Sequence, residues 1–302
     1  MNVIETNDLR YDFGGKPVLK GIDLAVQKGS IFGFLGPNGS GKTTTIKALL
    51  GLAHVPKNSV MLFGKDIRTC RIEILRNTGS LIEYPALYNH LSGYDNLHIL
   101  CNLTSTPKKR IEELLGIVSL ADEGRKKVRQ YSLGMKQRLG IAAALLTDPE
   151  LLILDEPTNG LDPAGIRDIR HLIRMLNQDF GKTIFISSHL LNEVEMLCSH
   201  LAVLNEGKLV FQGKVSELRD KYARLLMIDT SDNDRAADLV AQYYPVQLTG
   251  SLLEIVIKEK NDAAIISKIL FRNELDIYRL EPKSQNLEEL FFNLTANDSA
   301  HP

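Results

Sequence analysis

An eight-residue stretch, GPNGSGKT, occupies residues 36–43 and constrains the fold more than any other part of the chain. It satisfies the pattern G-x-x-x-x-G-K-[ST], in which a strand leads into a glycine-rich loop and the loop opens a helix. The apolar run SIFGFL precedes it and TTTIKALL follows it, so both flanking elements are present. A chance glycine-rich turn would lack this context. The stretch therefore predicts a phosphate-binding loop inside a βα unit.

The chemistry of such a loop gives its residues separate tasks. Backbone N–H groups face the phosphates of a nucleoside triphosphate, Lys42 bridges the β- and γ-phosphates, and the Thr43 hydroxyl binds Mg²⁺. We expect these residues to bind the nucleotide: Gly36, Pro37, Asn38, Gly39, Ser40, Gly41, Lys42, Thr43 and Thr44.

Polar side chains also follow two other apolar runs. LLILDEP places Asp155 and Glu156 at the end of an apolar strand, and TIFISSH ends with His189. An acid at a strand end of a phosphate-loop protein is an expected Mg²⁺ partner, which we assign to Asp155. The adjacent Glu156 is placed to act as general base on the attacking water. A lone histidine is more often structural, but the position of His189 directs it to the γ-phosphate.

The remaining pattern predicts an α/β fold. Residues 1–35 read as strands separated by glycine turns, of which FGGKP is the clearest, and residues 86–150 read as a mostly helical subdomain. The runs LLILDEP and TIFISSH are short and apolar on both faces, which indicates a parallel βα core. LAVLNEGKLVFQG reads as a hairpin that turns at Asn-Glu-Gly.

The chain changes character near Asp220, where we place a domain boundary between residues 1–220 and residues 221–302. The second part reads as βαββαβα, with a last helix at NLEELFFNLT. This order is compatible with a small ferredoxin-like α+β unit. It carries no catalytic motif.

The net charge, the cysteines and the hydropathy limit which partners and which compartment we expect. The formal net charge is −1, so nucleic acid is not expected as the main partner. Basic runs at residues 108–110 and 125–127 are more simply solvated helix ends or loops. The three cysteines lie far apart and suit a reducing compartment. There is no secretory signal and no apolar run long enough to span a bilayer, so a membrane would be met through a partner.

Five segments in this order resemble the ATP-binding-cassette (ABC) ATPases: GPNGSGKT, YSLGMKQR (131–138), LLILDEP, NGLD (159–162) and ISSH (186–189). The resemblance covers about residues 1–215 and implies ATP and Mg²⁺ as cofactors. It also implies a head-to-tail pair with a second copy or a homologous subunit, in which Ser132 and Gly134 contact the γ-phosphate in trans. A transmembrane permease would be the other partner, placing the chain in the cytoplasm at the inner face of the membrane.

The resemblance implies two further roles. An aromatic residue after the first strand stacks on adenine, which points to Phe13, with Tyr11 in reserve; a packed loop aromatic is the alternative. Asp162 would lie in the loop that links the two sites. Asn159 and Asp162 are equally suited to cap a helix, and the two roles are compatible.

The sequence departs from the family pattern at the signature, where Leu133 and Met135 replace Gly and Gln, and at Glu83. Glu83 stands about forty residues after Lys42, where members usually carry Gln. An acid there could bind Mg²⁺, directly or through water, or pair with a basic residue of the permease; a solvated loop acid is the alternative. With SLGMKQRLGIA, DEPTNGLDP and the C-terminal unit, it resembles the ATPase subunits of bacitracin- and lantibiotic-type exporters.

Two other functions remain open. A non-transport ABC ATPase that acts on the ribosome or on DNA usually has two cassettes or a long coiled coil, and this chain has one cassette and no heptad run. Alternatively, the C-terminal unit is a ligand-sensing or dimerisation module, which would make the protein chiefly regulatory.

Overall fold

The computed structural model describes residues 1–221, 224–257 and 259–283. The chain divides into two compact units, residues 1–215 and residues 216–302. This division lies five residues before the boundary that we predicted at Asp220. Each unit is described separately below.

A six-stranded sheet forms the centre of the first unit, in the order β12-β11-β5-β10-β9-β8. The strands β11, β5, β10, β9 and β8 run parallel to one another, and β12 is antiparallel to β11. Every residue of β5, β9 and β10 is buried, because these runs are apolar on both faces. The predicted parallel core is confirmed. The strands are β5 (Ile31–Leu35), β8 (Thr78–Leu81), β9 (Leu151–Asp155), β10 (Thr183–Ser188), β11 (His200–Asn205) and β12 (Lys208–Lys214).

The register of these strands brings the predicted site residues to one edge. Leu35, the last residue of β5, pairs with Ser188 of β10, and Asp155, the last residue of β9, pairs with Ser187. The phosphate-binding loop follows β5 and leads into α1 (Lys42–Leu49). Ligands of open α/β sheets bind beyond the carboxyl ends of the strands, which is where all three strand ends meet.

A smaller antiparallel sheet packs with α1 against the central sheet. Its order is β4-β1-β6-β7, built from β1 (Asn2–Thr6), β4 (Ala25–Gln27), β6 (Val60–Leu62) and β7 (Lys65–Asp66). Strands β2 (Leu9–Phe13) and β3 (Lys16–Ile22) form a separate hairpin. Gly14 and Gly15 close it with positive φ angles of 57° and 78°, a two-residue turn that matches strand twist. The core between these layers includes Ile4, Phe32, Phe34, Ile46, Leu62 and Phe185.

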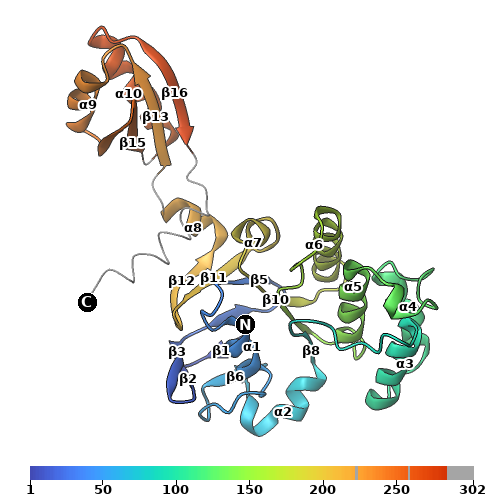
Figure 1. Cartoon of the computed structure of the whole chain (residues 1–302). Coiled ribbons are helices and arrows are strands. Elements are labelled where there is room, and N and C mark those ends of the chain that lie inside the picture. The colour runs from blue at the N-terminus through green and yellow to red at the C-terminus, as the bar shows by residue number, and fades with distance from the viewer. Residues whose placement is uncertain (222–223, 258, 284–302) are drawn as a thin grey trace. The chain divides into compact units, whose positions relative to one another are not determined.

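Helices gather at the β8 end of the sheet, where Figure 1 shows α3 (Gly93–Thr104), α4 (Lys109–Ile117) and α5 (Leu133–Ala144) in green. They correspond to the helical subdomain predicted at residues 86–150. Helix α5 contacts β8, and a short 3₁₀ helix at Val128–Gln130 precedes it. The remaining helices of this unit are α2 (Ile67–Arg76), α6 (Pro163–Gln178) and α7 (Leu191–Leu197).

The second unit contains an antiparallel sheet in the order β14-β15-β13-β16. Side chains of β13 and β15, including Leu226, Ile228 and Ile255, pack with Val240 of α9 and Ile266 of α10. The predicted order βαββαβ is present up to β16, and the predicted last helix at residues 286–295 lies outside the described residues. The elements are α8 (Val215–Lys221), β13 (Arg224–Thr230), α9 (Asn233–Ala241), β14 (Val246–Thr249), β15 (Leu252–Ile257), α10 (Lys260–Arg272) and β16 (Ile277–Lys283).

Candidate functional site

The phosphate-binding loop is fixed to the core at its two ends and open in its middle. A Cβ added at Gly36 would meet the carbonyl oxygen of Leu204 at 2.5 Å, and one at Gly41 would meet Leu19 Cδ2 at 2.8 Å. The φ angle of Gly41 is 110°, a backbone conformation that residues with a side chain rarely adopt. A Cβ at Gly39 would have no neighbour within 4 Å. The loop is therefore a fixed curve of backbone with free space above its centre, as a bound phosphate requires.

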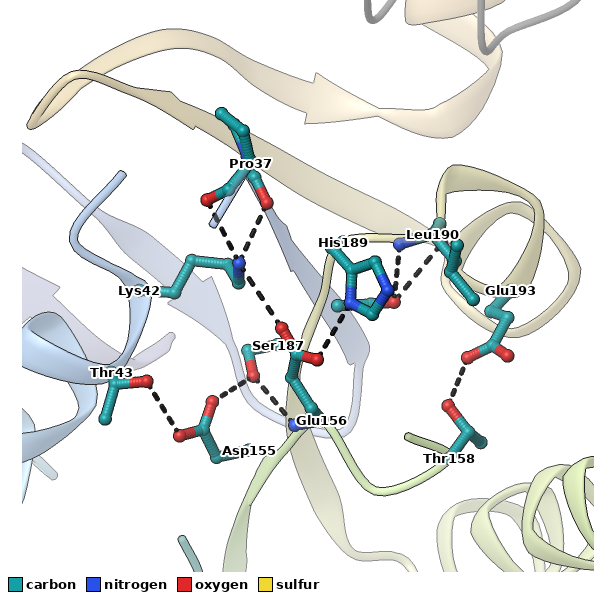
Figure 2. Close-up of polar contacts among 12 residues, drawn as sticks. Pro37, Lys42, Thr43, Asp155, Glu156, Thr158, Ser187, His189, Leu190 and Glu193 are labelled. Atoms are coloured by element: carbon teal, nitrogen blue, oxygen red, sulfur yellow. Dashed lines mark hydrogen bonds and ion pairs between the residues drawn. The ribbon is translucent and has the colours of Figure 1, made fainter. Parts of the chain in front are cut away.

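Lys42 begins α1 and turns its ammonium back over the loop. Nζ donates to the carbonyl oxygens of Gly36, at 2.8 Å, and Pro37, at 3.3 Å. The side chain is only 6% exposed, and Nζ also lies 3.4 Å from Oε1 of Glu156. Figure 2 shows Lys42 and Glu156 facing each other. The fixed positive charge therefore lies at the edge where the β- and γ-phosphates would bind.

Thr43, in α1, and Asp155, at the end of β9, are in direct contact. The Thr43 hydroxyl donates to Oδ2 of Asp155 at 3.0 Å, and the Ser187 hydroxyl donates to Oδ1. Asp155 is 2% exposed. A buried carboxylate held from two sides in this way keeps a fixed orientation. Ser187, from the run ISSH, is a site residue that our sequence prediction missed.

Glu156 and His189 lie face to face after the ends of β9 and β10. Nδ1 of His189 is 2.8 Å from Oε2 of Glu156 (Figure 2). The Glu156 N–H donates to the hydroxyl of Ser187, at 2.9 Å, and to its carbonyl oxygen, at 3.2 Å. Glu156 has a φ of 47°, a left-handed conformation that costs energy in a non-glycine residue. These backbone contacts hold it there and aim the carboxylate between Lys42 and His189.

A second hydrogen bond joins the loop after β9 to helix α7. The Thr158 hydroxyl donates to Oε2 of Glu193, which lies in the first turn of α7 (Figure 2). Sequence reasoning missed this contact. The contact joins residues 35 positions apart in the sequence, and no local pattern indicates it.

Glu83 contributes to a cavity of about 240 Å³ that also reaches the loop and the acids. Its lining residues are Thr43, Glu83, Tyr84, Gln137, Asp155, Glu156 and Asn159. Oε1 of Glu83 lies 3.7 Å from Nζ of Lys47 in α1, and both side chains are about half exposed. The structure thus brings Glu83 to the candidate metal site and also gives it a basic neighbour within the chain.

The donor set suits Mg²⁺ held together with a nucleotide. Within the described residues there is no cluster of three or more His, Cys, Asp or Glu side chains that could hold a metal alone. Mg²⁺ is commonly bound by one or two carboxylates, substrate phosphates and waters. The oxygens of Thr43 and Asp155, which lie 3.0 Å apart beside the loop, fit this arrangement.

Ser132 and Gly134 line a different cavity, of about 420 Å³, with Asp162. Ser132 caps α5, because its hydroxyl accepts from the Met135 N–H at 3.2 Å. Asp162 caps α6 in the same way and accepts from the Gly165 N–H at 2.9 Å. No residue of the phosphate-binding loop lines this cavity. Within one chain, therefore, the signature residues and the phosphate-binding loop do not line the same cavity.

The two candidate adenine partners differ in exposure. Phe13 ends β2 and is 71% exposed, whereas Tyr11 packs against the core. Phe13 therefore has the free ring face that stacking requires. Asn159, the last of the predicted cap residues, lines the Glu83 cavity, and its N–H donates to the Glu156 carbonyl at 3.1 Å.

None of the helices in the described part of the chain is both long enough and apolar enough to cross a bilayer.

Comparison with known proteins agrees with this site. A family model described as ABC transporter matches residues 19–159. The bacitracin transport ATP-binding protein BcrA of Enterococcus faecalis is 42% identical over 295 residues, which cover 97% of this chain and 96% of BcrA. The lantibiotic transport ATP-binding protein SrtF of Streptococcus pyogenes is 40% identical over 210 residues, covering 70% of this chain and 90% of SrtF. The structure of cbiO1 from Clostridium perfringens, part of the ABC transporter complex cbiONQ, is similar with a TM-score of 0.67 and 25% identity, over 80% of this chain and 96% of that one. The chain therefore belongs to the ABC transporter family, as an ATP-binding subunit that hydrolyses ATP.

Proposed function

We propose that this subunit drives a separate membrane permease that exports a peptide antibiotic of the bacitracin or lantibiotic kind. The relatives that carry those names support the substrate class, and their likeness extends over most of their length. The observation that carries the ATPase part is the position of the Glu156 carboxylate, between the ammonium of Lys42 and the imidazole of His189.

In this proposal each side chain of the site has its own step. Lys42 neutralises the phosphates, and Thr43 with Asp155 would hold Mg²⁺, which supplies further charge neutralisation when bound. Glu156 accepts a proton from the attacking water, because its carboxylate is fixed at the edge where the γ-phosphate would lie. His189 orients that carboxylate through its 2.8 Å contact and closes the site toward the γ-phosphate.

The second cavity supports head-to-tail pairing. Ser132 is at the start of α5, where the helix N-terminus and backbone N–H groups favour an anion. Because no loop residue lines that cavity, a γ-phosphate there would belong to the nucleotide of a second subunit. The predicted partner is another copy or a homologous ATPase subunit.

The C-terminal unit and the cell location complete the proposal. We infer that residues 221–302 form a ferredoxin-like domain, because the strand order β14-β15-β13-β16 follows from a βαββαβ chain of that type. Whether it senses a ligand or supports pairing is decided by comparing the ATPase rate of the whole chain with that of a chain ending at residue 221. The subunit is placed at the inner face of the membrane through its permease.

Two substitutions test the ATPase part. Lys42→Ala removes the charge on the phosphates and should abolish ATP binding. Glu156→Gln should keep ATP binding, lower hydrolysis by about 10²–10⁴-fold and trap the dimer, which sedimentation detects. Glu150→Gln is the matched control, since Glu150 precedes β9 and pairs with Lys28 away from the site. Hydrolysis at the wild-type rate in Glu156→Gln would exclude Glu156 as the base.

A resistance assay tests the substrate. A strain that lacks the subunit should become more sensitive to bacitracin or to a lantibiotic, and the wild-type gene, but not Glu156→Gln, should restore growth. Unchanged sensitivity to both classes would contradict antibiotic export while leaving the ATPase assignment intact.

A further inference from the structure

Thr158 lies in the loop that follows β9, and its side chain is bound to helix α7. The residue is 7% exposed, and its hydroxyl donates to Oε2 of Glu193 (Figure 2). Two residues earlier the same loop carries Glu156, whose carboxylate contacts both Lys42 and His189. Thr158 itself does not line the cavity that contains Glu156. The hydrogen bond to α7 is therefore made close to the candidate general base in the sequence, but outside the cavity in which the base acts.

Helix α7 gives this hydrogen bond a fixed anchor on the central sheet. Val194, next to Glu193, is 2% exposed and packs on Gly33, where an added Cβ would meet Val194 Cγ1 at 2.2 Å. Leu191, in the same turn, is 3% exposed. Gly33 lies in the middle of β5, which pairs with β10 on one side and β11 on the other. Because the first turn of α7 packs so closely on a buried strand, Glu193 can hold the loop in place.

Backbone hydrogen bonds within the loop connect Thr158 to Glu156. The Asn159 N–H donates to the Glu156 carbonyl oxygen at 3.1 Å, and the Leu161 N–H donates to the Thr158 carbonyl oxygen at 3.2 Å. Glu156 has a φ of 47°, and such a backbone conformation persists only where the surrounding structure fixes it. Ser187 holds the N–H of Glu156, and the side chain of Thr158 holds the turn that follows. The left-handed residue is therefore fixed on both sides.

We propose that Thr158 and Glu193 are positioning residues that keep the Glu156 carboxylate directed at the attacking water. This inference rests on the proposed function, because it takes Glu156 to be the general base. Thr158 and Glu193 accept no proton from the water; they fix the turn, and the turn fixes the carboxylate beside His189. A misplacement of about 1 Å can cost about 100-fold in rate. Loss of the hydrogen bond should therefore affect turnover, and not nucleotide binding, which depends on residues 36–43.

The test measures turnover and nucleotide binding separately in the full chain. Thr158→Val keeps the shape of the side chain and removes the donor, and Glu193→Ala removes the acceptor from a half-buried position. Each should lower kcat at least about 10-fold and leave the affinity for a fluorescent, non-hydrolysable ATP analogue within about threefold. Thr158→Ser restores the hydroxyl and should stay within about threefold of the wild-type kcat. Thr104→Val and Glu112→Ala, at exposed positions of α3 and α4, are the controls that should change neither quantity.

A double variant and a second background separate positioning from loss of structure. If the two side chains act through one contact, the variant with both Thr158→Val and Glu193→Ala should have a kcat within about threefold of the more severe single variant. In the Glu156→Gln background the base is absent, so Thr158→Val should change the residual single-turnover rate by less than about threefold. Unfolding of most of the protein would instead lower that residual rate as well.

A wild-type kcat in folded Thr158→Val or Glu193→Ala would overturn the proposal, and so would effects that multiply in the double variant. A loss of analogue affinity that matches the loss of kcat, or a further fall of the residual rate in the Glu156→Gln background, would also contradict it. Failure of the proposed function is recognised separately, because Glu156→Gln alone would then hydrolyse ATP at the wild-type rate.

Discussion

The imidazole Nδ1 of His189 lies 2.8 Å from the carboxylate Oε2 of Glu156, and this contact joins the ends of two adjacent parallel strands. Removing the imidazole removes the contact that orients this carboxylate and leaves its ion pair with Lys42. His189→Ala should therefore lower the ATPase rate at least about 100-fold while ATP affinity stays within about threefold. Turnover and fluorescent-analogue binding measure the two effects. His171→Ala, at an exposed position of α6, is the control; a wild-type rate in His189→Ala would exclude the role.

The effect of the Glu83 charge on Mg²⁺ binding can be measured separately from its ion pair with Lys47. Glu83→Gln removes one of the carboxylates that line the cavity and should weaken Mg²⁺-dependent ATP binding severalfold, because a charged carboxylate attracts the cation more strongly than a neutral amide does. Stability should change by less than about 0.5 kcal/mol, since the pair with Lys47 is half exposed. Glu73→Gln breaks a comparable surface pair with Lys65 as a control. Unchanged Mg²⁺ dependence in Glu83→Gln would make the acid incidental to the metal.

Ser132 has two roles that substitution can separate. Ser132→Ala removes the α5 cap, at a cost of about 1 kcal/mol, and should lower the melting temperature by about 2–4 °C. Ser132→Asn keeps a capping oxygen and should restore the melting temperature. Its larger side chain should still block ATP-driven dimerisation, measured by sedimentation in the Glu156→Gln background. If Ser132→Asn restored both the melting temperature and ATP-driven dimerisation, Ser132 would act only as a helix cap.

Asp148 connects the helical subdomain to the core. Oδ1 lies 2.9 Å from Nζ of Lys182, before β10, and 3.1 Å from Nη2 of Arg110 in α4. The hydrogen bond from Lys182 holds the pKa of Asp148 below its ordinary value of 3.8. A carboxyl whose pKa is depressed by folding stabilises the protein above its unfolded pKa, and this contribution is lost as the pH falls through the folded pKa.

Asp148→Asn should therefore lower the urea midpoint at pH 7 and pH 5 by similar amounts, and the difference should shrink only below about pH 4. The loss should stay under about 1 kcal/mol, because Asp148 is largely exposed. Asn suits this position because Asp148 has a φ of 55°, which Asn tolerates well. A difference that grows toward acid pH would contradict the assignment.

Much of the fold could be predicted because the relevant signals are local. The strand, loop and helix around Lys42, the apolar strands that end in Asp155 and His189, and the Gly14–Gly15 turn are each determined by neighbouring residues. The predicted order of strands and helices after residue 222 also follows from local periodicity.

The remaining contacts depend on packing between distant segments. Thr158 meets Glu193, Lys47 meets Glu83, and Ser187 holds the Glu156 backbone only after the strands have paired in register. Oε1 of Gln137 is buried and accepts no hydrogen bond from the described residues, which depends on how α5 packs and which no local sequence pattern indicates.

Helix α5 begins beside Ser132 in one cavity and passes Gln137 in the other. Five residues of α-helix rise only about 7.5 Å, which is too short a length to bend appreciably. A displacement of about one or two ångströms at one end of this helical segment would therefore displace the other end by a similar amount. The two cavities of one subunit would be coupled by the rigid first turns of α5, without a series of side-chain rearrangements between them.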